Sequence, residues 1–233
     1  SVPMAGAGRY QTETYIAKDA ETQSYEPRFT YYSFRYARVQ GINAEKIQLT
    51  GRLVYSDVPN TSTFFSDSRI VNEIFDMAIR TTSSLLHSYP EDCNREKLGW
   101  IRNGNIPNLL DNYDSRLFLE KWMRDIADTQ LPSGALPNVA PNDTYGMGSE
   151  YLWAGSFILI PWYLYRYYGD ILTAAEYYDQ MKAYYDWAAD YFAVYEEKNG
   201  NLEKINGLVY GVHGDWVSPG YRVPPEGSLV ANS

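Results

Sequence analysis

The stretch "DSRLFLEKWMRDIADTQ" (residues 114–130) decides the fold class, because its apolar side chains recur at the spacing of an α-helix. Asp114 stands where a helix N-cap belongs. The apolar stripe consists of Leu117, Phe118, Trp122 and Ile126. A helix with one apolar stripe packs that stripe against a neighbour. The stretch therefore predicts a helix in a packed, mainly helical domain.

The same periodicity continues on both sides of this stretch. "SDSRIVNEIFDMAIRTTSSLLHS" (66–88) and "TAAEYYDQMKAYYDWAADYF" (173–192) both have helical spacing, and the second opens on a capping box of Thr173 and Glu176. An apolar helix near 151–168 should stop at Gly169, and a weaker one within 101–112 should start or kink at Pro107. Long loops are expected at 88–100, 131–150 and 197–226. Successive helices whose long loops gather at one end form a rim that can hold a site.

The first 56 residues have a different pattern. "RFTYYSFRYARV" (28–39) and "KIQLTGRLVYS" (46–56) are rich in aromatic and β-branched residues, which favours strands. Two or three strands cannot form a closed sandwich by themselves. We expect residues 1–56 to be the last strands of an incomplete β-domain and residues 57–233 to form the helical region.

Composition excludes several classes of function. Asp and Glu outnumber Lys and Arg by 29 to 20, and this acidity disfavours nucleic acid and anionic membranes as partners. The longest apolar run (152–164) is too short to span a bilayer. A single cysteine, Cys93, excludes an internal disulfide and a multi-cysteine metal site, and two histidines are too few for a histidine-based one. No metal or other cofactor is expected, although a carboxylate-bound Ca²⁺ stays open. The 23 tyrosines and 6 tryptophans fit either helical packing or sugar binding.

The loop "EDCNREKLGW" (91–100) carries the chemistry of greatest interest. Asp92 and Glu96 are four residues apart, so both carboxylates could face one cavity. Glycoside hydrolysis needs one carboxylic acid to protonate the leaving oxygen and a second carboxylate to activate water or act as nucleophile. An apolar wall such as Trp100 would keep an acid protonated, and Arg95 would keep its partner ionised. The alternative interpretation is a solvated loop with an Arg–Glu surface pair.

A resemblance to a known family bears on this choice. "DCNREKLGW" is similar to the D-C-P-x-R-E-x-x-G-W signature of the α-L-rhamnosidases of glycoside hydrolase family 78. Further segments resemble that family in the right order between residues 25 and 233. They are "YEPRFTYYSFRYARVQG" (25–41), "KWMRDIADTQLPSGALPNVAP" (121–141), "IPWYLYRYYGD" (160–170) and "GDWVSPG" (214–220).

The resemblance implies a fold and a reaction. The fold is part of an (α/α)6 six-hairpin barrel preceded by strands of an incomplete β-sandwich. The reaction is inverting hydrolysis of terminal α-L-rhamnosides, with Glu96 as general acid and Asp92 on the sugar hydroxyls. Substrate-binding positions would be Arg95, Trp100, Asn103, Trp153, Asp215 and Trp216. His213, a lone histidine in a loop, is interpreted as incidental.

The resemblance also implies a setting for the enzyme. The substrate would be a rhamnose-containing oligosaccharide or plant glycoside, and the enzyme would be bacterial and periplasmic or secreted, with a cytoplasmic location left open. The catalytic base is expected beyond this chain, in the rest of the same polypeptide, so the fragment alone should be inactive.

Departures from the family pattern keep two alternatives open. The signature is one residue shorter here and lacks its proline, since Asn94 joins Cys93 directly to Arg95. Asn103 stands where many members carry Asp, and Asn cannot carry negative charge. The alternatives are an (α/α)6 glycosidase with another sugar specificity and a degenerate barrel that binds carbohydrate without cleaving it.

Overall fold

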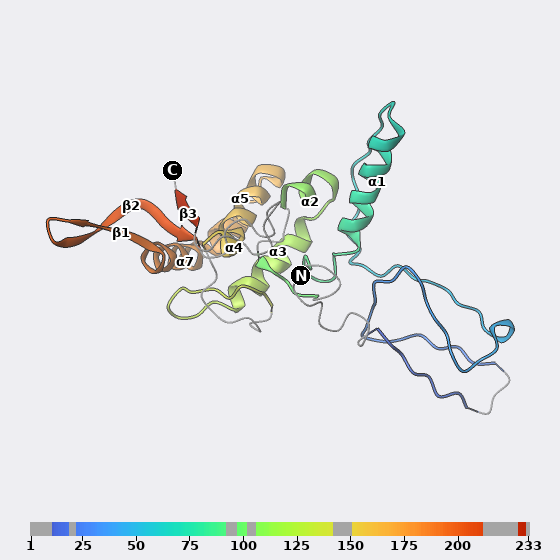
Figure 1. The fold of residues 1–233 in the computed structure, drawn as a ribbon. Helices are drawn as coiled ribbons and strands as arrows, with labels where there is room; N and C mark the ends of the chain where they lie inside the picture. The colour runs from blue at the N-terminus through green and yellow to red at the C-terminus, as the bar shows by residue number, and fades with distance from the viewer. Residues whose placement is uncertain are drawn as a thin grey trace.

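The computed structural model describes residues 11–18, 22–91, 97–101, 106–141, 151–211 and 228–231. Within these ranges the chain is mainly helical, with a short antiparallel sheet near its end (Figure 1). The helices are α1 (Arg69–Ser83), α2 (Ile106–Asn112), α3 (Arg116–Asp128), α4 (Tyr151–Ala154), α5 (Ser156–Tyr168), α6 (Leu172–Glu176) and α7 (Tyr178–Tyr191), and a 3₁₀ turn, η1, covers Ala44–Lys46. The strands are β1 (Ala193–Lys198), β2 (Asn201–Gly211) and β3 (Ser228–Ala231).

The core lies between α2, α3, α5 and α7. The largest side chains in it are fully buried, and they include Trp122, Leu119, Ile126, Phe157, Ile160, Leu164 and Tyr184. Burial of each such side chain is worth roughly 1.5–3 kcal/mol. The predicted stripe on α3 was correct at Trp122 and Ile126 but wrong at Leu117, which is 77% exposed. Leu119 and Met123 take its place, because the packed face is centred on Trp122.

Helix ends follow the chemistry of their residues. Gly169 ends α5 as predicted, with the left-handed φ of 69° that favours glycine. Pro107 is the second residue of α2, so it helps to start that helix. The capping box predicted at Thr173 was wrong, because α6 already begins at Leu172. Asp170 instead accepts the backbone N–H groups of Leu172 (2.9 Å) and Thr173 (3.3 Å) and the Thr173 hydroxyl (2.6 Å).

The sheet has the order β1-β2-β3, with both pairs antiparallel. β1 and β2 form the long hairpin at the left of Figure 1. Its turn is Asn199-Gly200, with φ values of 53° and 82°, and Lys198 pairs with Asn201 across it. Positive φ at both central residues is the type I′ condition that Asn-Gly satisfies best. The prediction of a long loop over 197–226 was therefore wrong for the parts that the end of β1 and the whole of β2 occupy.

The first segment lies at one end of the molecule, apart from the helices (Figure 1). Its described residues, 11–18 and 22–56, contain no strand, so the strands predicted at 28–39 and 46–56 were wrong. The backbone is extended, but no second segment within the described ranges pairs with it along a ladder. Phe34 (62%) and Tyr36 (82%) are accordingly exposed. A strand needs a hydrogen-bonded partner, and β propensity cannot supply one.

Helix α1 also stands apart from the core (Figure 1). It has the predicted apolar stripe, yet Ile70, Ile74 and Met77 are more than half exposed. Phe75 stacks on Phe64 with ring centroids 5.0 Å apart, and Ile79 packs partly against the core. No helix in the described ranges is both long and apolar enough to cross a bilayer.

Candidate active site

Two of the eight predicted site residues, Trp100 and Trp153, fall within the described residues. Their rings approach each other with centroids 5.2 Å apart and planes tilted by 58°. Both side chains are half-buried. Sequence positions 53 residues apart thus meet in one aromatic pair. The other six predicted residues lie outside the described residues: Asp92, Arg95, Glu96, Asn103, Asp215 and Trp216.

The backbone around Trp100 is fixed by pairing with the 138–140 segment. Trp100 forms an isolated antiparallel bridge with Val139. The N–H of Ile101 donates to the Asn138 carbonyl (3.1 Å), and the N–H of Ala140 donates to the Gly99 carbonyl (2.9 Å). Val139 is buried, so this pairing is shielded from water. Trp100 is therefore held by regular backbone hydrogen bonds as well as by its own packing.

Gly99 allows this pairing because it has no side chain. A Cβ on Gly99 would lie 2.1 Å from the Ala140 carbonyl oxygen and 2.8 Å from Cδ2 of Tyr89. Real Cβ atoms essentially never come closer than 3.0 Å to another heavy atom. The glycine before Trp100 in the "LGW" motif is thus required by the close approach of two backbones.

Immediately before residues 92–96, a buried carboxylate faces the N-terminal segment. Glu91 is only 4% exposed, and its Oε1 accepts a hydrogen bond from the Tyr31 hydroxyl. Nδ1 of His87 lies 3.3 Å from Glu91 Oε2, and the imidazole stacks on the Tyr31 ring at 4.1 Å with planes 12° apart. The other imidazole nitrogen, Nε2, lies 2.8 Å from the Val54 carbonyl.

Burial and hydrogen bonding set the electrostatics of this arrangement. The Val54 carbonyl can only accept, so His87 Nε2 is the donor of that hydrogen bond. Burial raises the pKa of Glu91, although Tyr31, His87 and Lys97 each act to lower it. Burial and the hydrogen bond to Glu91 raise the pKa of Tyr31 well above its ordinary value, so the phenol stays protonated as donor.

Immediately after residues 92–96, a lysine binds the same tyrosine. Lys97 Nζ donates to the Tyr31 carbonyl oxygen (2.5 Å) and lies 4.0 Å from the centroid of its ring. Lys97 has a φ of 56°, and its carbonyl accepts a hydrogen bond from the Tyr89 hydroxyl (3.2 Å). We call Tyr31, His87, Glu91 and Lys97 the junction cluster.

Sequence reasoning missed the junction cluster. Glu91 belongs to the quoted loop, but its charge suggested a solvated position, and His87 was considered only as a metal ligand. The available signal was the run "HSYPE" (87–91), in which a histidine and a glutamate flank one tyrosine, Tyr89. The partner Tyr31 lies 60 residues away in a separate segment, and no local pattern identifies it.

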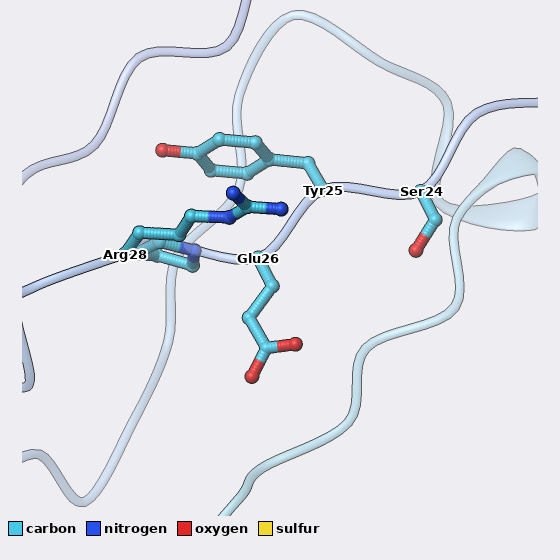
Figure 2. Close-up of a pocket in the computed structure, with 5 residues that line it drawn as sticks. Ser24, Tyr25, Glu26 and Arg28 are labelled. Atoms are coloured by element: carbon cyan, nitrogen blue, oxygen red, sulfur yellow. The ribbon is translucent and has the colours of Figure 1, made fainter.

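Neither the surface hollows nor the acidic groups of the described residues suggest another site. Residues Ser24–Arg28 line an open hollow in the first segment (Figure 2). It contains none of the predicted site residues, and its Glu26 pairs with exposed Arg52 at 3.2 Å. Within the described ranges, no three His, Cys, Asp or Glu side chains gather in a way that could hold a metal ion.

Comparison with known proteins defines the class of this chain. Residues 59–232 match the bacterial alpha-L-rhamnosidase six-hairpin glycosidase domain, and residues 5–55 match the bacterial alpha-L-rhamnosidase concanavalin-like domain. Most of the chain thus belongs to the six-hairpin glycosidase domain class, and the mainly helical fold class predicted from the sequence is confirmed.

Named relatives agree with the two domain matches. An alpha-L-rhamnosidase of Formosa agariphila is 30% identical over 236 residues, which cover 94% of this chain and 24% of the relative. One of Streptomyces avermitilis is 30% identical over 226 residues, which cover 92% of this chain and 20% of the relative. The chain belongs to the bacterial α-L-rhamnosidase family, and it spans about a fifth to a quarter of the length of these relatives.

Solved structures place the chain in the same family. The alpha-L-rhamnosidase from Dictyoglumus thermophilum superposes with a TM-score of 0.63 at 28% identity, over 75% of this chain and 19% of that one. The Streptomyces avermitilis alpha-L-rhamnosidase, complexed with L-rhamnose, superposes with a TM-score of 0.56 at 28% identity, over 60% of this chain and 14% of that one.

Proposed function

We propose that the protein containing this chain hydrolyses terminal α-L-rhamnosides with inversion, and that Glu96 is the general acid. The observation that carries the proposal is the Trp100–Trp153 pair in a chain of the rhamnosidase family. Trp100 follows Glu96 by four residues in the sequence. Tryptophan rings offer flat apolar faces to the C–H face of a sugar. A related structure holds L-rhamnose, which supports this sugar as the ligand class.

The proposed reaction needs carboxyl groups on both sides of the sugar ring. The Glu96 carboxyl gives its proton to the glycosidic oxygen as the bond from the anomeric carbon to that oxygen breaks. Water attacks the anomeric carbon from the opposite face and loses its proton to a second carboxylate, about 6.5–9.5 Å from the first in inverting enzymes. We propose that this base lies outside the present 233 residues and that Asp92 binds sugar hydroxyls. Arg95, Asn103, Asp215 and Trp216 are the further substrate-binding candidates.

The natural substrate would be a rhamnose-containing oligosaccharide or plant glycoside, met in the periplasm or outside the cell. An apolar wall formed by Trp100 would favour the protonated form of a nearby acid. The structure brings Trp153 to the same place, so two tryptophans could shield the site from water.

The test compares Glu96→Gln with Glu45→Gln in the complete protein on an alkyl α-L-rhamnoside, whose leaving group needs full protonation. Glu45 is an exposed residue of η1 and serves as the matched control. Loss of a general acid should lower kcat by roughly 10²–10⁴-fold, and the control should be unchanged. NMR of the wild-type reaction should show β-L-rhamnose as the first anomer formed. Full activity of Glu96→Gln, or α-L-rhamnose as first product, would refute the assignment.

Asn103 and the shortened signature favour a second candidate, a barrel that binds carbohydrate without cleaving it. Calorimetry with L-rhamnose separates the two. Binding without turnover on any glycoside supports this second candidate, and turnover confined to other glycosides indicates a different sugar specificity.

A further inference from the structure

Tyr31 contacts both neighbours of the 92–96 segment. Through its hydroxyl it binds Glu91, the residue directly before the segment. Through its carbonyl and its ring it binds Lys97, the residue directly after it. Glu91 and Lys97, the residues on either side of the five-residue segment, therefore both contact Tyr31. The dimensions of Tyr31 limit how far apart Glu91 and Lys97 can lie.

The contacts of Tyr31 with Glu91 and Lys97 cross a domain boundary. Tyr31 belongs to the part that matches the concanavalin-like domain, and Glu91 and Lys97 belong to the part that matches the six-hairpin domain. The same boundary is crossed by the hydrogen bond from His87 Nε2 to the Val54 carbonyl (2.8 Å). Close to it, Ser56, which lies between the two matched parts, donates its N–H to the Leu86 carbonyl (2.6 Å). The orientation of Tyr31 is therefore set by the N-terminal segment as well as by the cluster.

The contacts of Tyr31 restrict the positions of the side chains that make them. Glu91 is almost fully buried, so loss of the phenol donor would leave a carboxyl oxygen short of a hydrogen bond away from water. Stacking of His87 on the Tyr31 ring sets the ring plane, and the Lys97 ammonium lies over the face of that ring. Because a buried polar group tolerates little displacement, the position of Glu91 is defined narrowly. Half-buried Lys97 is held by its contacts with the Tyr31 carbonyl and ring.

We propose that Tyr31 is a positioning residue for the general acid: through Glu91 and Lys97 it sets where Glu96 stands relative to the glycosidic oxygen. The proposal rests on the function proposed above for Glu96. A shift of about 1 Å in a reacting group can lower a rate by roughly 100-fold, so two anchored ends have a direct catalytic consequence. The N-terminal domain would thereby contribute to catalysis without touching the substrate.

The test removes one hydroxyl and leaves the rings in place. Tyr31→Phe in the complete protein loses the bond to Glu91 but keeps the stacking on His87 and both contacts with Lys97. Tyr32→Phe is the matched control, because it removes the adjacent hydroxyl, which binds exposed Glu13. Each variant is assayed on a nitrophenyl α-L-rhamnoside, whose leaving group needs little protonation, and on an alkyl α-L-rhamnoside, whose leaving group needs full protonation.

A misplaced acid has a distinctive signature. Tyr31→Phe should lower kcat on the alkyl rhamnoside by about tenfold or more, with a smaller loss on the nitrophenyl rhamnoside and an unchanged KM for both. Tyr32→Phe should behave as wild type on both substrates. Equal losses on the two substrates, or no loss, would overturn the proposal, because a purely structural defect lowers the amount of active enzyme without regard to the leaving group.

Lys97→Met provides a second route should Tyr31→Phe fold poorly. It keeps the length of the side chain but removes the ammonium that donates to the Tyr31 carbonyl and lies over the Tyr31 ring, so it should show the same leaving-group dependence. Glu96→Gln is measured in parallel. If Glu96→Gln is inactive and neither cluster variant discriminates between leaving groups, the positioning role alone is refuted. If Glu96→Gln retains full activity, the proposed function falls and this proposal with it.

Discussion

Replacing Gly99 by alanine should separate the backbone pairing that holds Trp100. The new Cβ would lie 2.1 Å from the Ala140 carbonyl oxygen, whereas Cβ atoms in proteins essentially never come closer than 3.0 Å to such an atom. The 138–140 segment must therefore withdraw by about 1 Å. Tyr89 blocks movement of the methyl group to the other side, because its Cδ2 would be 2.8 Å away.

The magnitude follows from what this displacement breaks. The Ala140–Gly99 and Ile101–Asn138 hydrogen bonds, at 2.9 and 3.1 Å, are both near the centre of the normal range, so an added 1 Å removes them. Two such bonds are worth about 1 kcal/mol each, and an overpacked buried site costs about 1–3 kcal/mol more. The expected loss in the free energy of unfolding is therefore about 3–5 kcal/mol, or roughly 6–20 °C in Tm for a cooperative unit of 150–250 residues.

The assay is thermal unfolding of the complete protein, followed by tryptophan fluorescence, with L-rhamnose affinity measured on the folded variant. Gly51→Ala is the matched control, because no atom lies within 4 Å of a Cβ built there and Gly51 has no positive φ. Gly99→Ala should melt well below this control and bind the sugar more weakly, since Trp100 moves away from Trp153. A melting curve and an affinity indistinguishable from those of Gly51→Ala would refute the steric reasoning.

Two further substitutions test the sugar wall and the helix start. Trp153→Ala removes one ring of the aromatic pair and should raise the Kd for L-rhamnose about tenfold, near the upper limit for one aromatic contact. The control is Trp162→Ala, which removes an exposed ring on α5. Equal effects of the two substitutions on the Kd would contradict the proposed wall. Asp170→Ala leaves the first N–H groups of α6 without their acceptor and should cost about 1–2 kcal/mol at neutral pH. Burial acts to raise the pKa of Asp170, but the hydrogen bonds from Thr173 and Leu172 outweigh it and lower the pKa. The stabilisation of α6 by the carboxylate is therefore present above the ordinary pKa of 3.8 and is lost as pH falls through the lowered pKa. Urea unfolding should show a deficit that shrinks in acid, and a deficit independent of pH would contradict the role of the carboxylate.

Helices were predictable because their signals are local. The stretch at 114–130 contains α3, and the end of α5 at Gly169 follows from the freedom of glycine at positive φ. The error at Leu117 arose because a helix with apolar residues at several successive positions has more than one candidate face. The neighbouring helices choose between these faces, and that choice is not written within α3 itself.

The sheet was missed although one clear signal was present. Asn199-Gly200 is the dipeptide that type I′ hairpin turns prefer, and it separates β1 from β2. The strands around it carry charged residues such as Glu196, Glu197 and Lys198, which obscured the pattern of strand and turn. The reverse error occurred at 28–39, where strong β propensity produced no strand. Pairing decides whether an extended segment becomes a strand, and pairing is not a local property.

The candidate site also contains residues that the sequence predicted and residues that it could not predict. From its family resemblance, the sequence predicted substrate-binding roles for Trp100 and Trp153. These roles stay predictions, and the structure shows that the two rings lie 5.2 Å apart. The sequence could not predict that Glu91 is buried, because a run of charged residues ordinarily faces water. The burial of Glu91 depends on Tyr31, which arrives from another domain and supplies the donor that makes burial tolerable. An acidic residue that is buried beside the family signature and hydrogen-bonded to the other matched domain is thus the basis for proposing that one domain positions a residue of the other.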